Sequence, residues 1–226
     1  KVISYAKKLN TSFAQFAVAN ITKMAYKPKS INHAQTSALP LVGASALQAL
    51  EEHMKLARGQ KILIHGGAGG IGHIAIQLSK AFGAYVATTV SVKDEEFVKN
   101  LGADLIIDYK KENFEDLVKD YDAVFDNVGG QTSDRSFKSL RKGGILVSMV
   151  GRPNLELAKN YGVTAIGQFT NSSVEHFNKL SELVDAGKIK VHVDRTFNLD
   201  QVKEAFRYME EGHPQGKVVL NINHTE

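Results

Sequence analysis

Residues 61–84 constrain the fold of this chain most strongly. They read as a short apolar run, a glycine-rich turn and an amphipathic stretch, and Gly67, Gly69 and Gly72 in the turn fit G-x-G-x-x-G. In such a turn the first glycine permits a tight bend, the second leaves room for a pyrophosphate, and the third lets a helix pack against the strand. The segment therefore predicts a strand–turn–helix unit that binds a dinucleotide.

The stretch after the turn has the spacing of a helix. One face carries Ile71, Ile74, Ala75, Leu78, Ala81 and Phe82, and Gly83 follows where a capping glycine is expected. Free N–H groups and the positive end of the helix dipole favour an anion at its start. The P-loop of nucleoside triphosphatases needs Gly-Lys-Ser/Thr at the end of its turn. Here His73 follows Gly72, so the turn is not a P-loop. A tight turn that binds nothing is the other interpretation.

Apolar runs and helical patterns then alternate, with a new strand about every twenty residues. The further strands are expected over 85–90, 105–107, 123–125, 145–150 and 163–169. Gly143 and Gly144 introduce the strand over 145–150. Nearly all of these runs are apolar, as in a parallel sheet covered by helices on both faces. The pattern predicts an α/β fold, a doubly wound parallel six-stranded Rossmann sheet.

The two ends of the chain do not follow this rhythm. We expect strand and loop over 11–27, a connection marked by Pro28 and Pro40, and helix in the segment 32–50 after Pro40. Ser172 and Glu175 predict a capping box for a helix that Gly187 ends. A strand over 191–197, a helix capped by Asp200 and a strand over 217–222 complete the chain. These flanks predict part of a second lobe.

Composition excludes several classes of protein. The 226 residues include no cysteine, so disulfides and thiolate-bound zinc are impossible, and a reducing, cytoplasmic location fits. The net charge of +4 is not gathered into a basic run, which disfavours nucleic-acid binding. No apolar run is long enough for a membrane span. The chain begins with Lys1 and shows no signal peptide, and we expect that an N-terminal portion is missing.

The end of the second predicted strand discriminates between cofactors. NAD-selective folds place a carboxylate there to hold the ribose hydroxyls, whereas Ser91 and Lys93 suit a 2′-phosphate. Asp94 is nearby but is expected to start the next helix. This favours NADP over NAD, the alternative being that Lys93 is an ordinary surface lysine.

Catalytic and metal-binding residues are harder to assign. Asn127 follows a strand and either bonds a ribose or carboxamide or forms a turn. The Tyr-x-x-x-Lys pair of short-chain dehydrogenases is absent, and no acid–base set is evident. His65 is expected to be a packed core histidine. No histidines have i, i+4 ligand spacing, so we expect no metal site and leave the catalytic residue unassigned.

These motifs resemble the zinc-free quinone oxidoreductase, zeta-crystallin-like branch of the medium-chain dehydrogenase/reductases. The segments that match are SFAQFAVAN, SALPLVGASALQAL, ILIHGGAGGIGHIAIQLSKAFGA, LGADLIIDY, DAVFDNVGG, LRKGGILVSMVG, LVDAGKI and GKVVL. The resemblance covers nearly the whole chain. It implies NADPH-dependent hydride transfer to a quinone or an activated enone, without zinc.

The resemblance also implies site residues and domains. The cofactor contacts that carry over are Ser45, Gly69, Gly70, Ile71, Ser91, Lys93, Tyr109, Asn127, Val150 and Gly151, with weaker agreement at Phe169, Thr170, Asn171 and Lys217. Residues 1–35 match the end of an N-terminal GroES-like catalytic lobe, 36–187 the NADP-binding Rossmann domain, and 188–226 a segment that returns to the lobe. Related reductases often form homodimers through the sixth strand, here 163–169.

Two other functions stay open on the sequence alone. One is a non-catalytic dinucleotide-binding protein that senses redox state. The other is a methyltransferase-like domain, since that class also opens with a glycine-rich turn. Turnover of a quinone with NADPH would distinguish an oxidoreductase from the non-catalytic binding protein. A comparison of NADPH with S-adenosylmethionine as stabilising ligands would distinguish it from the methyltransferase-like domain.

Overall fold

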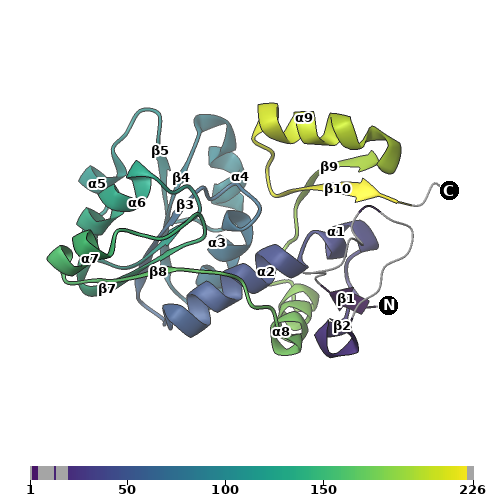
Figure 1. Cartoon of the computed structure of the whole chain (residues 1–226), viewed down its shortest axis with the longest axis horizontal. Helices are drawn as coiled ribbons and strands as arrows, with labels where there is room; N and C mark the ends of the chain where they lie inside the picture. Colours follow the sequence, from purple (N-terminus) through teal and green to yellow (C-terminus); the bar gives the residue numbers. More distant parts are fainter. Residues whose placement is uncertain (1, 5–12, 14–19, 223–226) are drawn as a thin grey trace.

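A computed structural model describes residues 2–4, 13 and 20–222 of the chain. Part of the strand and loop expected over 11–27 lies outside the described residues. The part that is described holds a short helix η1 (Ile21–Lys23) and β2 (Met24–Tyr26), and β2 pairs antiparallel with β1 (Val2–Ser4). β1 and the C-terminal strand β10 (Lys217–Asn221) lie on the same side of the molecule (Figure 1).

The centre of the molecule is a six-stranded sheet in which every pair of neighbours is parallel. Its order is β5-β4-β3-β6-β7-β8, so the chain starts in the middle and winds outward in both directions. The predicted doubly wound Rossmann sheet is therefore confirmed. The strands are β3 (Lys61–His65), β4 (Tyr85–Val90), β5 (Leu105–Asp108), β6 (Tyr121–Asp126), β7 (Leu140–Ser148) and β8 (Thr164–Gly167).

Helices cover both faces of the sheet (Figure 1). One face carries α2 (Pro40–Leu47), α3 (Gly72–Ala81) and α4 (Glu95–Asn100), and the other carries α5 (Phe114–Leu117), α6 (Gln131–Ser136) and α7 (Leu155–Tyr161). Alternate side chains of β3 divide between them: Ile62 and Ile64 join the first core, whereas Leu63 joins the second with Phe137. All four side chains are fully buried, which explains why the strands read as continuous apolar runs.

The helix expected after Pro40 is confirmed, and a second, short helix precedes it in the segment 32–50. Asn32 and Gln35 form a capping box for α1 (His33–Ser37), and Pro40 then begins α2 as a first-turn residue. After α2 the chain continues as a π-helical turn, η2 (Gln48–His53). Such turns are rare and often occur near functional sites.

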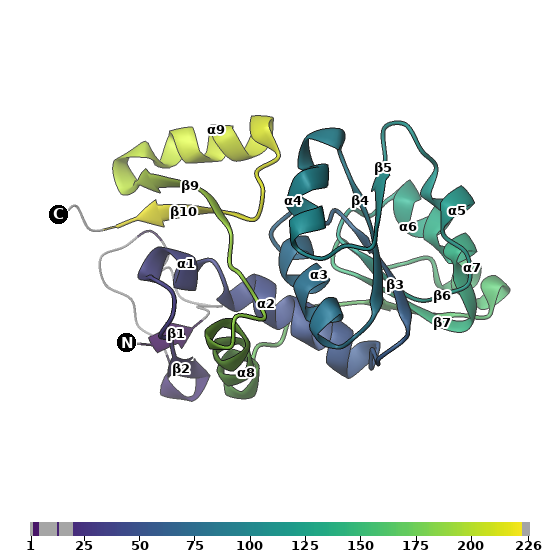
Figure 2. The same cartoon turned by 180° about the vertical axis from the view of Figure 1, so that it is seen from behind.

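The C-terminal part forms a second, smaller unit beside the sheet. Here α8 (Val174–Asp185) leads to β9 (Val193–Asn198), then through η5 (Leu199–Gln201) to α9 (Val202–Gly212) and β10 (Lys217–Asn221). β9 and β10 pair parallel in a two-stranded sheet, and α9 lies along it (Figure 2). This unit stands on the same side of the molecule as β1 and β2.

Two predicted caps are wrong. The capping box of α8 is formed by Ser173 with His176, one position after the predicted pair, because either serine satisfies the local pattern. Asp200 does not cap α9, since Asn198 and Gln201 form a capping box one turn earlier and start η5. The expected strand over 191–197 is β9, which begins two residues later.

The predicted bounds of β7 are also wrong. The expected strand over 145–150 begins instead at Leu140 and ends at Ser148. Gly143 and Gly144 lie inside the strand, where the pairing with β6 shifts in register. Gly143 adopts φ +75° and donates its N–H to Gly162 O at 2.8 Å, so the bend is made by a residue without a side chain. The remaining short helices are η3 (Val92–Asp94) and η4 (Phe137–Ser139).

Candidate dinucleotide site

The fold brings the predicted site residues to one edge of the sheet. In parallel strands the carboxyl ends share an edge, and ligands of open α/β sheets bind there. The glycine-rich turn follows β3, Ser91 and Lys93 follow β4, and Tyr109 follows β5. Asn127 follows β6, Val150 and Gly151 follow β7, and Phe169 follows β8. Ser45 reaches the same edge from α2, and Lys217 from the start of β10.

The glycine-rich turn is packed on two sides. A Cβ added at Gly67 would lie 2.0 Å from Thr88 Oγ1 on β4. One added at Gly72 would lie 2.2 Å from Gly66 O, so α3 begins directly against the turn. At Gly69 the nearest atom is Gly66 O, at 3.4 Å. The first and third glycines are thus required by packing, whereas the second leaves its surface clear.

The N-terminus of α3 faces this turn without a cap from any described side chain. Ile71 occupies the N-cap position and makes no side-chain hydrogen bond there. His73, in the first turn of α3, is buried and bonds the carbonyl of Gly69 through Nδ1 at 3.1 Å. Burial lowers the pKa of His73 to about 4, so the ring is neutral at physiological pH. Its role at the turn is structural.

The C-terminal unit closes over the turn. Gly216 N donates to Ala68 O at 2.8 Å. The adjacent Lys217 lays its Cδ 2.9 Å from the position that a Cβ of Gly70 would take. Burial lowers the pKa of Lys217 below its usual value. The chain therefore places the side chain of Lys217 across the glycine-rich turn, and its contact with a cofactor stays a prediction.

The loop after β4 contacts the C-terminal unit as well. Ser91 Oγ donates to Asp94 Oδ2 at 2.7 Å, and Lys93 Nζ donates to Gly212 O at 2.9 Å, at the end of α9. Tyr109 stands next to this loop, because its N–H donates to Val90 O at 3.2 Å, and its side chain is 54% exposed. Ser91, Lys93 and Tyr109 thus gather at the ends of β4 and β5.

Asp126 organises the loop after β6. Its buried carboxylate accepts the N–H groups of Val128 and Gly129, both at 2.9 Å, and the hydroxyl of Ser133 at 2.6 Å. Asn127 Nδ2 donates to the carbonyl of His65 at 3.0 Å. The Oδ1 atom of Asn127 is buried and has no hydrogen-bond partner among the described residues. Asp126 was not predicted, although its position at a strand end was a usable signal.

His65 is a core residue, as predicted. The ring is fully buried and bonds Thr89 Oγ1 at 3.0 Å and Ser136 Oγ at 2.9 Å. Burial lowers the pKa of His65 to about 4, which outweighs the attraction of the nearby Asp126 carboxylate. The ring therefore ties β3 to β4 and α6 and does not reach the open edge of the sheet.

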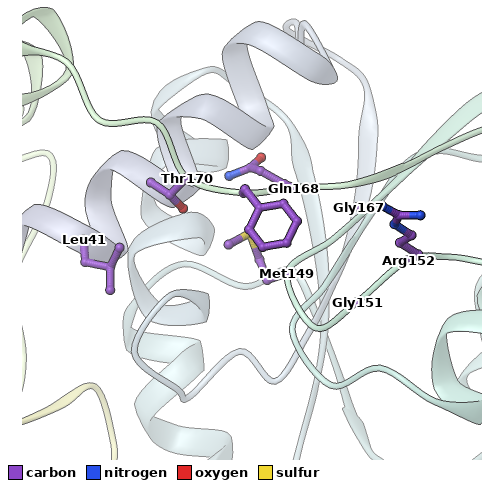
Figure 3. Close-up of a pocket in the computed structure, with 8 residues that line it drawn as sticks. Leu41, Met149, Gly151, Arg152, Gly167, Gln168 and Thr170 are labelled. Atoms are coloured by element: carbon purple, nitrogen blue, oxygen red, sulfur yellow. The ribbon is translucent and has the colours of Figure 1, made fainter. Parts of the chain in front are cut away.

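A cleft of about 530 Å³ lies beyond these loops, at the ends of β7 and β8 (Figure 3). Its lining residues are Leu41, Met149, Gly151, Arg152, Gly167, Gln168, Phe169 and Thr170. Leu41 and Thr170 stand on one side of the cleft, and Arg152 lies on the far side, beyond Gly167. Phe169 is 88% exposed, so an apolar ring is available at this edge.

Hydrogen bonds from α2 and η2 fix the wall of the cleft. Ser45 is fully buried, and its Oγ lies 2.6 Å from Thr170 Oγ1. Gln168 Nε2 donates to Ser45 O at 3.0 Å, while its buried Oε1 lacks a partner among the described residues. Gln48 Oε1 accepts the N–H of Asn171 at 2.9 Å. The two glutamines were not predicted, because no sequence pattern links them to the loop after β8.

Metal ligands and membrane spans were also sought. Over residues 2–4, 13 and 20–222, no three His, Cys, Asp or Glu side chains lie close enough together to hold a metal ion. In the same part of the chain, no helix has the length and apolar character needed to cross a membrane.

Comparison with known proteins assigns the family. Residues 101–220 match the family described as zinc-binding dehydrogenase. The chain is 32% identical over 224 residues to the chloroplast envelope quinone oxidoreductase homolog of Arabidopsis thaliana, covering 92% of this chain and 68% of that protein. The chain belongs to the quinone oxidoreductase branch of the medium-chain dehydrogenase/reductases. The predicted resemblance is thereby confirmed.

Two further proteins are similar over most of the chain. The NADPH-dependent alkenal/one oxidoreductase of Arabidopsis thaliana, a chloroplastic protein, is 39% identical over 215 residues, or 92% of this chain and 52% of the other. The quinone oxidoreductase of Coxiella burnetii has a TM-score of 0.86 at 34% identity, covering 91% of this chain and 66% of that structure. The chain spans 52–61% of the length of several curated relatives that it matches.

Proposed function

We propose that this chain belongs to an NADPH-dependent oxidoreductase that transfers a hydride to a quinone or an activated enone. The observation that carries the proposal is the alignment of three features along one sheet edge. These are the glycine-rich turn crossed by Lys217, the loop that holds Ser91 and Lys93, and the cleft beside Phe169. The names of similar proteins, an NADPH-dependent alkenal/one oxidoreductase and quinone oxidoreductases, support the same chemistry.

The residues at this edge fit a dinucleotide. The surface of Gly69 is clear, and the start of α3 faces it without a side-chain cap from the described residues. Farther along the edge, the buried acceptors Asn127 Oδ1 and Gln168 Oε1 lack protein partners among the described residues. Buried polar atoms are nearly always bonded, so two such acceptors at one edge favour a ligand that carries hydrogen-bond donors.

Each predicted residue then has a proposed role. The turn from Gly67 to Gly72, including Gly70 and Ile71, holds the pyrophosphate together with Lys217. Lys93 and Tyr109 donate to the 2′-phosphate, and Ser91 borders it while its hydroxyl stays on Asp94. Ser45, Asn127, Val150, Gly151 and Phe169 border the ribose and the nicotinamide. Bound NADPH supplies the hydride, and the side chains supply binding, orientation and exclusion of water at the cleft.

Titration of the purified chain with NADPH and with NADH tests the cofactor assignment. We expect tighter binding of NADPH, and loss of about 1 kcal/mol or more of that affinity in Lys93→Ala, since charge-assisted hydrogen bonds contribute roughly 1.5–3 kcal/mol. Affinity for NADH should hardly change. Lys99→Ala, on neighbouring α4, is the matched control. Equal losses for both cofactors would exclude Lys93 as a phosphate ligand.

Oxidation of NADPH in the presence of a quinone or an enone tests the reaction itself. A chain that binds NADPH but turns over neither acceptor is a dinucleotide-binding or redox-sensing protein. We further propose that the reaction is metal-independent, because the sequence offers no cysteine for thiolate-bound zinc. Activity should survive exhaustive chelation. Loss with recovery on addition of zinc refutes this.

We also propose a homodimer through β8. This strand is at the edge of the sheet, and neither charge nor proline protects its residues Thr164 to Gly167 from pairing. Beside it, Leu155 and Tyr161 of α7 are exposed by 66% and 37%. Pairing with a second copy about a two-fold axis would cover both features. Thr164→Pro should yield monomers in light scattering, and a wild-type chain that is already monomeric at high concentration contradicts the proposal.

The domain division and the location are proposals of the same kind. Residues 1–35 and 188–226 belong in this view to a GroES-like catalytic lobe, and 36–187 to the NADP-binding domain. The separate pairing of β9 with β10 and of β1 with β2, outside the six-stranded sheet, supports this division. The cytoplasmic location stays a prediction, and similar proteins include chloroplastic ones.

A further inference from the structure

One segment of the C-terminal unit touches both loops of the proposed dinucleotide site. We name residues 212–217 the phosphate strap. At one end, the carbonyls of Gly212 and His213 accept hydrogen bonds from Lys93 Nζ at 2.9 and 3.4 Å. At the other end, Gly216 bonds Ala68 in the glycine-rich turn. The strap thus spans from the proposed 2′-phosphate loop to the proposed pyrophosphate loop.

Between these ends the strap holds a buried carboxylate. Asp94, the last residue of η3 and the N-cap of α4, is only 6% exposed. Its Oδ2 accepts the Ser91 hydroxyl at 2.7 Å, and its Oδ1 accepts Gln215 Nε2 of the strap at 3.0 Å. Within the described residues, no cation forms an ion pair with Asp94. Neutral donors alone therefore hold this carboxylate inward.

The position of Asp94 gives this hydrogen bond a consequence for the cofactor. A carboxylate after the second strand of a Rossmann sheet selects NAD, because it accepts the ribose hydroxyls and repels a 2′-phosphate. Asp94 lies four residues after Val90, the last residue of β4. Because the Asp94 carboxylate is turned inward, it neither accepts the ribose hydroxyls nor repels a 2′-phosphate. Without Gln215, one carboxylate oxygen loses its donor, and the group gains by turning toward solvent and the ribose.

We infer that Gln215 is a specificity-determining residue that keeps the site selective for NADPH by holding Asp94 away from the ribose. It acts through Asp94 and is a positioning residue. The inference rests on the proposed function, because it concerns the selectivity of that same site. Within the strap, the role of Gln215 is thus distinct from that of Lys217 at the turn.

The test compares the dissociation constants of NADPH and NADH for wild type and Gln215→Met, measured by nicotinamide fluorescence on the whole chain. Methionine keeps the length of the side chain and removes the donor. We expect the ratio of NADPH to NADH affinity to fall by about tenfold, the effect of losing one hydrogen bond to a charged group. Gln201→Met, in the same C-terminal unit but remote from Asp94, should leave the ratio unchanged. Circular dichroism checks that each variant folds.

A second pair of variants separates selectivity from loosening of the strap. In an Asp94→Asn background the negative charge is absent, so Gln215→Met should no longer change the ratio. An unchanged ratio in the single variant overturns the inference, as do equal losses for both cofactors. The same holds if the ratio falls equally in the Asp94→Asn background. If wild type binds neither cofactor, the proposed function fails, and the inference fails with it.

Discussion

Two buried histidines make the stability of this chain sensitive to mild acid. Burial lowers the pKa of His65 and of His73 from 6.5 to about 4. The unfolded chain takes up these protons near pH 6.5, whereas the folded chain takes them up only near pH 4. Lowering the pH below 6.5 therefore favours unfolding. The penalty grows until pH 4 and is constant below it, and neither group contributes above 6.5.

The size of the effect follows from the two pKa values. A tenfold change in proton affinity corresponds to about 1.4 kcal/mol, so linkage gives a loss of about 1 kcal/mol per histidine at about pH 5.5, and about 2 kcal/mol at about pH 5. Together the two rings would remove about 4 kcal/mol at about pH 5, a large share of the 5–15 kcal/mol typical of folded domains.

Urea unfolding near neutral pH and again near pH 5 measures this loss. His65→Gln and His73→Gln each remove one titrating ring, and each should lose about 2 kcal/mol less than wild type over this range, whatever the stability of the variant near neutral pH. His53→Gln, in η2, is the control and should behave as wild type. The reasoning is refuted if the two variants lose as much stability as wild type.

Two further changes test the packing of the site. Gly72→Ala should destabilise the chain by about 3 kcal/mol or more in urea unfolding, because its Cβ would lie 2.2 Å from Gly66 O. Gly59→Ala, at an open position with φ +82°, should cost about 1 kcal/mol. Similar costs for the two changes would contradict the packing argument. Asp126→Asn should lower the free energy of unfolding by about 1–3 kcal/mol, because an amide cannot accept from Ser133 and from the N–H groups of the loop at once. An unchanged melting temperature would show that the loop after β6 does not depend on the carboxylate.

Local signals predicted most of the fold. The helix after the glycine-rich turn and the strand that begins at Tyr85 were predicted at nearly their observed bounds, because apolar periodicity and the capping Gly83 agree there. The parallel arrangement of the strands follows from the regular alternation of strands and helices, whereas their order in the sheet was not predicted. The start of β7 was missed because Gly143 has the local character of a breaker, and its N–H is satisfied only by Gly162, from the adjoining βα unit.

Some residues of the candidate site could be predicted from the sequence, and others could not. Residues that follow strands could be predicted, because the carboxyl ends of parallel strands share an edge whatever the details of the loops. Gln168 and Gln215 could not. Each acts on a residue more than a hundred positions away, Ser45 and Asp94, and neither glutamine lies in a motif. Such contacts depend on how the C-terminal unit and α2 pack onto the finished sheet.

The hydrogen bond between Gly216 and Ala68 also has a consequence for the order of events during synthesis. The turn at Ala68 leaves the ribosome early, and its partner leaves only after all six strands of the sheet. The sheet can pair while the turn is still uncovered, since its own contacts are nearer in sequence. A chain interrupted after α8 should therefore keep a complete sheet and a bare glycine-rich turn, and a ligand that needs Lys217 would distinguish finished chains from interrupted ones.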